Sequence, residues 1–203
     1  YQTIENALNN GLAANLAGGT HHAFSDHGSG YCIFNDIAVA CKKIRQDKPW
    51  INKILIIDLD VHQGDGTAYI LKDDTNTEIM SIHCKQNFPL KKQISTYDYS
   101  LKAGTTDSDY LNVLEHFLFK IVNINQFDLI IYDAGVDVHA NDGLGLFNIS
   151  TGGIYKRDQM VVDTCVNAGI PLACLIGGGY NKNLEYLSHI HSQLFLAIEN
   201  CSH

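Results

Sequence analysis

The sequence of 203 residues lacks an apolar stretch long enough to span a membrane, and no signal peptide is visible. It begins with Tyr1 rather than methionine, and its first residues read as the middle of a helix. We therefore expect an N-terminal region to be missing. For that reason the absence of a targeting signal excludes little.

The six cysteines lack a CxxC pair and a regular spacing. Several lie inside apolar runs, as Cys174 does between Pro171 and Ile176. A disulfide framework would need paired spacing, so we expect reduced and mostly buried thiols in an intracellular protein. The expected compartment is the cytoplasm, with the nucleus also possible for a eukaryotic source.

Positive charge is scarce as well, because 14 Lys and Arg residues face 22 Asp and Glu residues. The resulting net charge of −8 argues against direct nucleic-acid binding, which usually requires a basic face. It is compatible with a basic substrate, such as a lysine-bearing tail. The remaining composition is that of a globular domain that can bury a sizeable core.

Short runs rich in Ile, Leu and Val predict strands within residues 53–61, 78–84, 128–136 and 171–178. The runs lack strict alternation, as expected for parallel strands covered on both faces. Helices are predicted at 34–47, 66–72, 108–125, 151–168 and 183–199, with Ser108 as an N-cap. Alternating strands and helices predict a three-layer α/β/α fold with a central parallel sheet, in one domain over residues 1–203.

The strongest chemical signal follows the first predicted strand, in Asp58-Leu-Asp60-Val-His62. Side chains alternate in an extended chain, so these three should share one side. Such groups are costly to bury alone, and a bound cation would offset that cost. Asp137 follows the third predicted strand and could complete three ligands for zinc or a similar metal. His139, two residues later, leaves an alternative or second metal position open.

A histidine pair, His21-His22, follows two glycines near the start of the chain. Histidine carries protons near neutral pH, and a carboxylate partner decides which ring nitrogen holds the proton. The available partners are Asp58 and Asp65. An isolated pair of this kind is more often an exposed loop, so its weight comes from the neighbouring metal motif.

Three glycines and a tyrosine, Gly177 to Tyr180, follow the last predicted strand. Glycines there indicate a tight turn lining a cavity, and the phenol of Tyr180 could donate a hydrogen bond to a developing oxyanion. A flexible turn with a packing tyrosine explains this motif equally well by itself.

Together these segments resemble the histone deacetylase family, within the arginase-like fold. GGTHHAF, SGYCIFND, IIDLDVHQGDG, YDAGVD and GGGY occur in the family's order across nearly the whole chain. The segment around Asn87-Phe88-Pro89, with Gly104, Thr105 and Asp107, is most similar to class IV and bacterial members. In that family the missing N-terminal region supplies part of the fold and of the tunnel rim.

The resemblance implies hydrolysis of acetyl or longer acyl groups from lysine side chains of proteins. His22 would be the general base, oriented by Asp65. His21, backed by Asp58, would help to position water and protonate the leaving amine. Tyr180 would polarise the acyl carbonyl.

The resemblance also implies cofactors and a substrate tunnel. The implied zinc ligands are Asp60, His62 and Asp137. A structural potassium ion is implied at Asp58, Asp60, His62, Ser81 and Ile82. The implied substrate-binding residues are Gly30, Tyr31, Phe88 and Gly178.

Several alternatives stay open. A manganese ureohydrolase shares the fold but needs a second Asp-x-Asp pair, where this chain has Asp137-Val-His139. A deacetylase of small amines such as acetylpolyamines would use the same catalytic residues. A catalytically silent scaffold that binds acylated amines would be indicated by loss of a ligand, and none is lost. The site could also accept iron or cobalt.

Overall fold

The computed structural model describes residues 1–122 and 127–201, in which six parallel strands form one central sheet. The strand order across the sheet is β1-β6-β5-β2-β3-β4, and every pair of neighbours is parallel. The strands are β1 (Leu12–Asn15), β2 (Ile54–Asp58), β3 (Thr77–Cys84), β4 (Tyr97–Leu101), β5 (Leu129–Asp133) and β6 (Leu172–Leu175).

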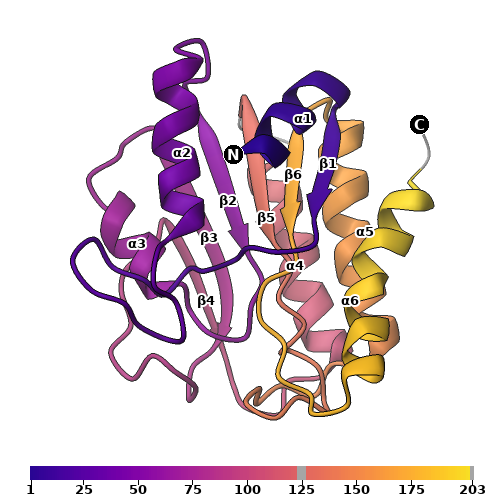
Figure 1. Cartoon of the computed structure of the whole chain (residues 1–203). Coiled ribbons are helices and arrows are strands. Elements are labelled where there is room, and N and C mark those ends of the chain that lie inside the picture. The colour runs from indigo at the N-terminus through magenta and orange to yellow at the C-terminus, as the bar shows by residue number, and fades with distance from the viewer. Residues whose placement is uncertain (123–126, 202–203) are drawn as a thin grey trace.

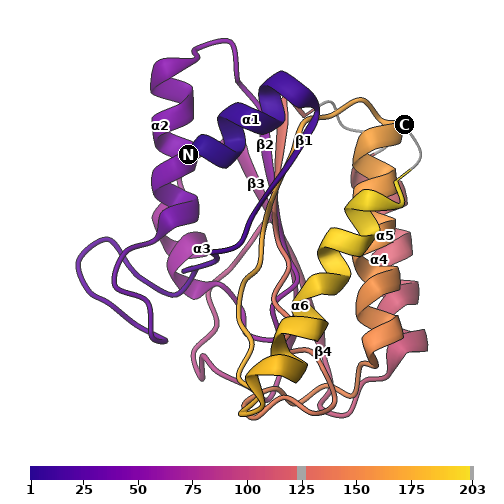
Figure 2. The same cartoon turned by 45° about the vertical axis from the view of Figure 1, so that its right-hand side comes forward.

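Helices cover both faces of this sheet, which confirms the predicted α/β/α architecture. Figure 2 shows α1, α2 and α3 on one side of the sheet and α4, α5 and α6 on the other. The helices are α1 (Gln2–Asn10), α2 (Asp36–Asp47), α3 (Asp65–Leu71), α4 (Asp107–Ile121), α5 (Thr151–Asn167) and α6 (Leu184–Glu199). No helix in the described ranges is both long and apolar enough to cross a membrane.

The two faces of the sheet bury separate apolar cores. In β2, Leu55 and Ile57 belong to the core beneath α4, α5 and α6, while Ile54 and Ile56 belong to the core beneath α1 and α2. All four side chains are fully buried. Each such side chain contributes roughly 1.5–3 kcal/mol when it leaves water. The central strand is therefore an uninterrupted aliphatic run.

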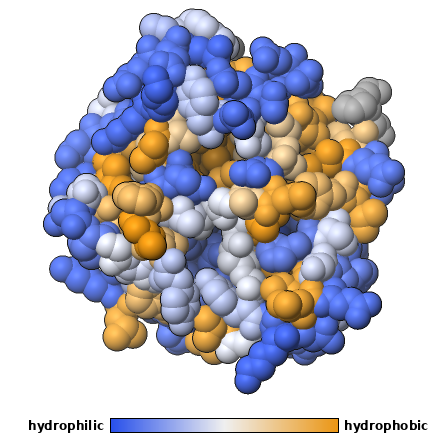
Figure 3. Space-filling model, viewed as in Figure 1, coloured by the Kyte–Doolittle hydropathy of each residue, from blue (hydrophilic) through white to orange (hydrophobic). Residues whose placement is uncertain are grey.

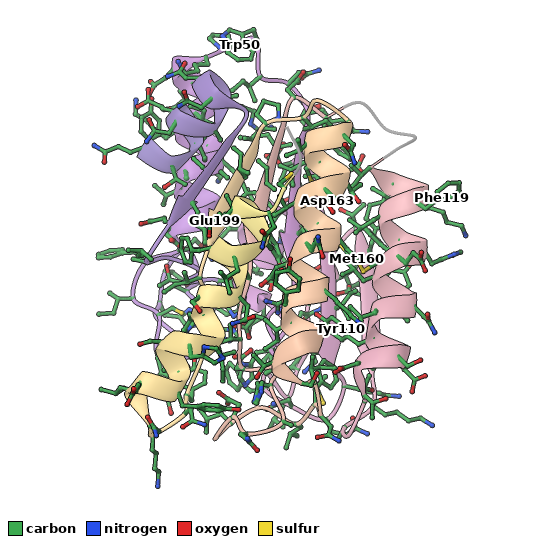
Figure 4. All side chains as sticks on the ribbon, turned by 90° about the vertical axis from the view of Figure 1, so that its right-hand side faces the viewer. Trp50, Tyr110, Phe119, Met160, Asp163 and Glu199 are labelled. Carbon is green, nitrogen blue, oxygen red and sulfur yellow. The ribbon has the colours of Figure 1, made fainter. Side chains whose placement is uncertain are left out.

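The helices turn one side toward the core and the other toward solvent. Figure 4 shows Tyr110 of α4 among the packed layers and Phe119 at the outer side of the same helix, where 69% of it is exposed. The face in Figure 3 is hydrophilic over α2 and carries separate apolar groups elsewhere.

Some sequence expectations need correction. The pattern does not predict β1 or β4, which are short edge strands without a long aliphatic run. Helix α4 begins at Asp107 after the N-cap Thr106, so the prediction of Ser108 as N-cap is wrong. Residues 123–125 of that predicted helix lie outside the described residues. The N-caps that do accept hydrogen bonds through side chains are Asn35, Ser150 and Asn183.

The parallel strands all end toward the same edge, shown at the bottom of Figure 1. Six loops begin there: 16–35 after β1, 59–64 after β2, 85–96 after β3, 102–106 after β4, 134–150 after β5 and 176–183 after β6. Ligands of parallel sheets generally bind at this edge. The unpredicted strand β1 matters most here, because it delivers the histidine pair to the site.

Candidate metal and catalytic site

Asp60, His62 and Asp137 form one buried cluster at this edge of the sheet. The Nδ1 atom of His62 lies 3.0 Å from a carboxylate oxygen of Asp60 and 3.0 Å from one of Asp137. At most 6% of any of these residues is exposed. Burial and the nearby Asp60 raise the pKa of Asp137 to about 7. Two buried carboxylates and an imidazole that converge in this way fit a divalent cation such as zinc.

The turn that carries the cluster is held by its own acids. Strand β2 ends at Asp58, whose carboxylate accepts the backbone N–H of Asp60 at 3.2 Å. Asp60 accepts the N–H of His62 at 2.9 Å, and Asp137 accepts that of Val61 at 2.9 Å. The expectation of an extended backbone through all three residues is therefore wrong, because the strand ends at Asp58 and a turn carries Asp60 and His62. The three side chains still lie near one another, since Asp58 and Asp60 both lie within 4 Å of His21.

The two histidines lie side by side, each against its own carboxylate. Nδ1 of His21 lies 2.8 Å from Asp58, Nδ1 of His22 lies 2.7 Å from Asp65, and the two Nε2 atoms are 3.1 Å apart. Asp65 is the first residue of α3. These are the two pairings that the sequence analysis expected.

Their surroundings push the two histidines in opposite directions. Burial opposes charge on His21, but the carboxylates of Asp58 and Asp60 outweigh it and raise the pKa of His21 above its ordinary value. Burial and the adjacent His21 lower the pKa of His22. A neutral His22 can accept a proton, whereas a cationic His21 can donate one.

Asp133 is a buried acid to which the sequence analysis gave no role. It ends β5, directly beside Asp58 in the sheet, and its carboxylate lies 3.6 Å from Nδ1 of His21. Within the described residues neither of its oxygens has a hydrogen-bond partner, and burial raises its pKa. Its place as the last residue of a strand that neighbours β2 is the signal that could have found it.

Tyr180 reaches the cluster through a glycine turn. Gly177 has a φ of 60°, and the N–H of Gly178 donates to Asp60 at 3.0 Å. A Cβ on Gly178 would lie 2.5 Å from carboxylate oxygens of both Asp60 and Asp137, so only glycine fits there. The ring centre of Tyr180 lies 6.2 Å from that of His62. Burial and the two acids raise the pKa of Tyr180, which keeps its phenol protonated as a donor.

A cavity of about 380 Å³ leads to these residues. Its lining consists of His22, Ser29, Gly30, Tyr31, His62, Asn87, Phe88, Leu144 and Tyr180. Three of the four residues expected to bind substrate therefore line it. The fourth, Gly178, lines a neighbouring cavity of about 150 Å³.

The cavity walls approach the catalytic groups closely. The ring of Phe88 packs edge-on against His22, with ring centres 4.9 Å apart. Gly30 lies so close to His22 that a Cβ would come within 2.3 Å of its ring. Tyr31 is 86% exposed and forms part of the cavity mouth.

Two further predicted positions lie beside the main cluster. Ser81 pairs in register with Asp58, and its hydroxyl lies 2.9 Å from His83. The potassium site that includes Ile82 stays a prediction. His139 does not join the metal cluster, because its ring nitrogens meet the hydroxyl of Thr151 at 3.1 Å and the N–H of Asn141 at 3.0 Å.

A buried arginine that the sequence analysis did not identify supports the site from behind. Arg157 of α5 is fully buried, and its guanidinium donates to the carbonyls of Gly135 at 2.6 Å and Ala134 at 3.1 Å. Its Nε donates to Asp158 at 2.9 Å. The sequence signal that could have found Arg157 is its place as a charged residue among the buried positions of the predicted helix 151–168.

Comparisons with known proteins agree with this geometry. The family model described as the histone deacetylase domain matches residues 1–196. An uncharacterized protein of Picosynechococcus is 49% identical over 96% of this chain and 65% of its own length. Histone deacetylase 2 of Arabidopsis thaliana is 35% identical over 87% of this chain and 46% of its own length. The acetoin utilization protein AcuC of Bacillus subtilis is 33% identical over 83% of this chain and 46% of its own length.

Solved structures extend the likeness to three dimensions. An HDAC homolog from Aquifex aeolicus superposes with a TM-score of 0.81 at 27% identity, covering 98% of this chain and 54% of that one. The chain thus spans less than two thirds of the length of these relatives.

Proposed function

Because this chain belongs to the histone deacetylase family, we propose that it is a hydrolase of the deacetylase type that removes acetyl or longer acyl groups from lysine side chains of proteins. The products are a carboxylate and the free amine. The observation that carries the proposal is the convergence of the Asp-His-Asp cluster, both histidine–aspartate pairs and Tyr180 where two neighbouring cavities meet, since His22 and Tyr180 line both cavities.

The proposed cofactor is one zinc ion held by Asp60, His62 and Asp137. When bound, zinc supplies Lewis acidity and makes water a better nucleophile near neutral pH. The donor set supports this choice, since buried carboxylates and imidazole are ligands that zinc accepts. A structural potassium ion at Asp58 and Ser81 belongs to the same proposal.

The chain's own residues account for the proton transfers. His22, kept neutral by burial and by its charged neighbour, accepts a proton from the attacking water. His21, held as a cation by Asp58, protonates the departing amine. The phenol of Tyr180 donates to the oxygen of the acyl carbonyl as negative charge develops on it.

The cavity lining supports acyl-lysine over acylated polyamines. Tyr31, Phe88 and Leu144 offer apolar surface to an aliphatic stem. Among the described residues that line the cavity there is no carboxylate to pair with the secondary amines of a polyamine. A lysine side chain carries no further charge along its stem, so it suits this lining better.

The test combines metal content with hydrolysis of acetyl-lysine, myristoyl-lysine and acetylpolyamine substrates. We expect one zinc per chain, preferred hydrolysis of acyl-lysine, and loss of both metal and activity in Asp137→Ala. Asp109→Ala, which removes an exposed carboxylate of α4, serves as the matched control and should behave as the wild type. Well-folded wild-type protein with neither metal nor hydrolysis would refute the proposal, and preference for acetylpolyamine would reassign the substrate.

A further inference from the structure

The loop that follows β5 carries an acid, Asp142, whose carboxylate organises three backbone amides. One oxygen accepts the N–H of Tyr180 at 2.7 Å. The other accepts the N–H groups of Leu144 and Gly145, each at 2.8 Å. Asp142 itself is held in the loop because its N–H donates to the carbonyl of His139 at 2.9 Å. One partly buried side chain thus joins two loops that are far apart in sequence.

The groups that Asp142 joins belong to different walls of the catalytic cavity. Tyr180 and Leu144 both line it. The carbonyl of Leu144 accepts a hydrogen bond from the side chain of Asn87 at 2.9 Å, which extends the connection to the wall that contains Phe88. The position of Tyr180 is therefore coupled, through Asp142 and Leu144, to the opposite wall of the catalytic cavity.

The same loop also packs onto the metal cluster. A Cβ on Gly145 would lie 1.8 Å from the carbonyl oxygen of Asp137, so the loop backbone rests directly on a candidate ligand. A Cβ on Gly143 would lie 2.9 Å from the carbonyl oxygen of Tyr180. The approach of Gly143 to Tyr180 leaves little room for the two loops to slide past each other, whereas the approach of Gly145 to Asp137 lies within the loop 134–150 and packs that loop against a candidate ligand.

Tyr180 depends on such support because it follows three glycines, the residues with the greatest backbone freedom. Two carboxylates restrain the turn: Asp60 accepts the N–H of Gly178, and Asp142 accepts that of Tyr180. Asp60 is also a candidate metal ligand. Asp142 is not part of the metal cluster, so its contact is with the turn itself.

We propose that Asp142 is a positioning residue that fixes the Tyr180 phenol for polarising the acyl carbonyl and couples it to the tunnel wall at Leu144. This inference rests on the proposed deacylase function. Asp142 touches no reacting atom, and its effect on turnover passes through Tyr180. Removing an oxyanion donor outright typically lowers turnover by about 10²–10³, and displacing it should forfeit a large part of that factor.

The first variant is Asp142→Asn, which preserves shape but replaces one of the two accepting oxygens with an NH2 group, which donates and cannot accept. Three N–H groups need both oxygens, so the variant leaves at least one amide without its partner. We expect kcat to fall about 10- to 100-fold with KM changed less than about threefold. Asp107→Asn is the matched control, because Asp107, the first residue of α4, also accepts two hydrogen bonds, both from Ser150, and does not line the cavity.

A double-mutant cycle with Tyr180→Phe separates positioning from general damage. If Asp142 acts through the phenol, Asp142→Asn should cost less than about threefold once that phenol is absent. Equal losses in both backgrounds would overturn the inference, as would an effect no larger than that of Asp107→Asn. Gly143→Ala approaches the same junction from the carbonyl of Tyr180 and should show the same dependence on the phenol, even if Asp142→Asn folds poorly.

A binding measurement makes the test independent of turnover. An alkyl hydroxamate carries a carbonyl oxygen that can accept a hydrogen bond from the same hydroxyl, and its Kd can be measured by calorimetry on metal-loaded protein. Asp142→Asn should weaken binding in the wild-type background and add little to Tyr180→Phe. Coupled binding in a protein that hydrolyses no acyl amine would sink the proposed function while the positioning role stands. Additive weakening in an active enzyme would overturn the positioning role of Asp142 and leave the proposed function standing.

Discussion

The middle of strand β2 and the edge where it ends are equally buried but chemically opposite. Ile56 and Ile57 are fully buried among aliphatic side chains, whereas Asp58 and Asp60, a few residues on, are 2% and 1% exposed. Burial of the first pair stabilises the fold, while burial of ionised carboxylates costs free energy unless partners compensate. The middle of β2 therefore serves the stability of the fold, whereas the buried acids at its end serve the chemistry of the site.

The unsatisfied groups follow the same division. Four buried side-chain oxygens lack a hydrogen-bond partner within the described ranges, and three of them belong to Asp133 and Asp158. Asp133 lies beside His21, and Asp158 is paired with the arginine behind the site. Well-packed interiors seldom leave such groups without partners, so Asp133, whose two carboxylate oxygens both lack one at the end of β5, is the exceptional group among the described residues at this edge.

Removing a bound metal should have the largest effect on the strand-end edge and none on the aliphatic middle of β2. A chelator would take away the cation proposed to be held by Asp60, His62 and Asp137 and leave the two buried carboxylates uncompensated, so we expect hydrolysis to cease. A ligand present at about 1,000 times its Kd stabilises the native state by roughly 4 kcal/mol, which corresponds to a fall of roughly 10 °C in Tm on removal. Calorimetry with and without chelator measures this, and readdition of zinc is the control. An unchanged Tm would mean that the edge is stable without a cation.

Substituting Tyr180→Phe should produce the next largest effect. It deletes one donor at the edge and leaves the aliphatic middle untouched, so we expect a loss of about 10²–10³ in kcat with Tm and zinc content unchanged. Steady-state kinetics and elemental analysis of the same sample test this. Retention of wild-type turnover would exclude the phenol from catalysis.

Asp65→Asn should have a smaller effect that depends on pH. The variant removes the carboxylate from His22, leaving burial and His21 to lower the pKa of that histidine further. In the wild type the pKa of His22 is already below its ordinary 6.5, so the base form persists above that pH and the rate should fall only below it. We expect kcat to drop about 10- to 100-fold in the variant, with the acid limb of the kcat/KM profile moved lower. An acid limb that does not move would place the titrating group elsewhere.

The two regions also differ in how well sequence predicts them. The run Ile54–Asp58 is readable because aliphatic residues covered on both faces need only local pattern. The pairs His21–Asp58 and His22–Asp65 were predictable because each partner lies in a distinctive motif. Strands β1 and β4 were missed, since half-exposed edge strands carry no long aliphatic run.

The contacts that support the site could not be predicted, although the end of a strand marks Asp133 and the inward-facing stripe of a helix marks Arg157. Asp133 matters because β5 lies beside β2 with Asp58 opposite, and that register exists only in the folded sheet. Asp142 meets Tyr180 across 38 positions of sequence, and Arg157 meets Gly135 across 22. Such contacts depend on loop packing, which neither periodicity nor motif spacing encodes.

The smallest effect on turnover should come from the aliphatic middle. Ile56→Ala deletes buried atoms from the core beneath α1 and α2, and we expect it to lower the free energy of unfolding by about 2–5 kcal/mol. The site's hydrogen bonds do not involve this side chain, so kcat per folded molecule should stay within about twofold of the wild type. Urea unfolding gives the stability change, and active-site titration with a hydroxamate gives the folded fraction for normalising kcat. A large loss of kcat per folded molecule would show that the middle of the strand also tunes the chemistry at its end, and the division between the two regions would then fail.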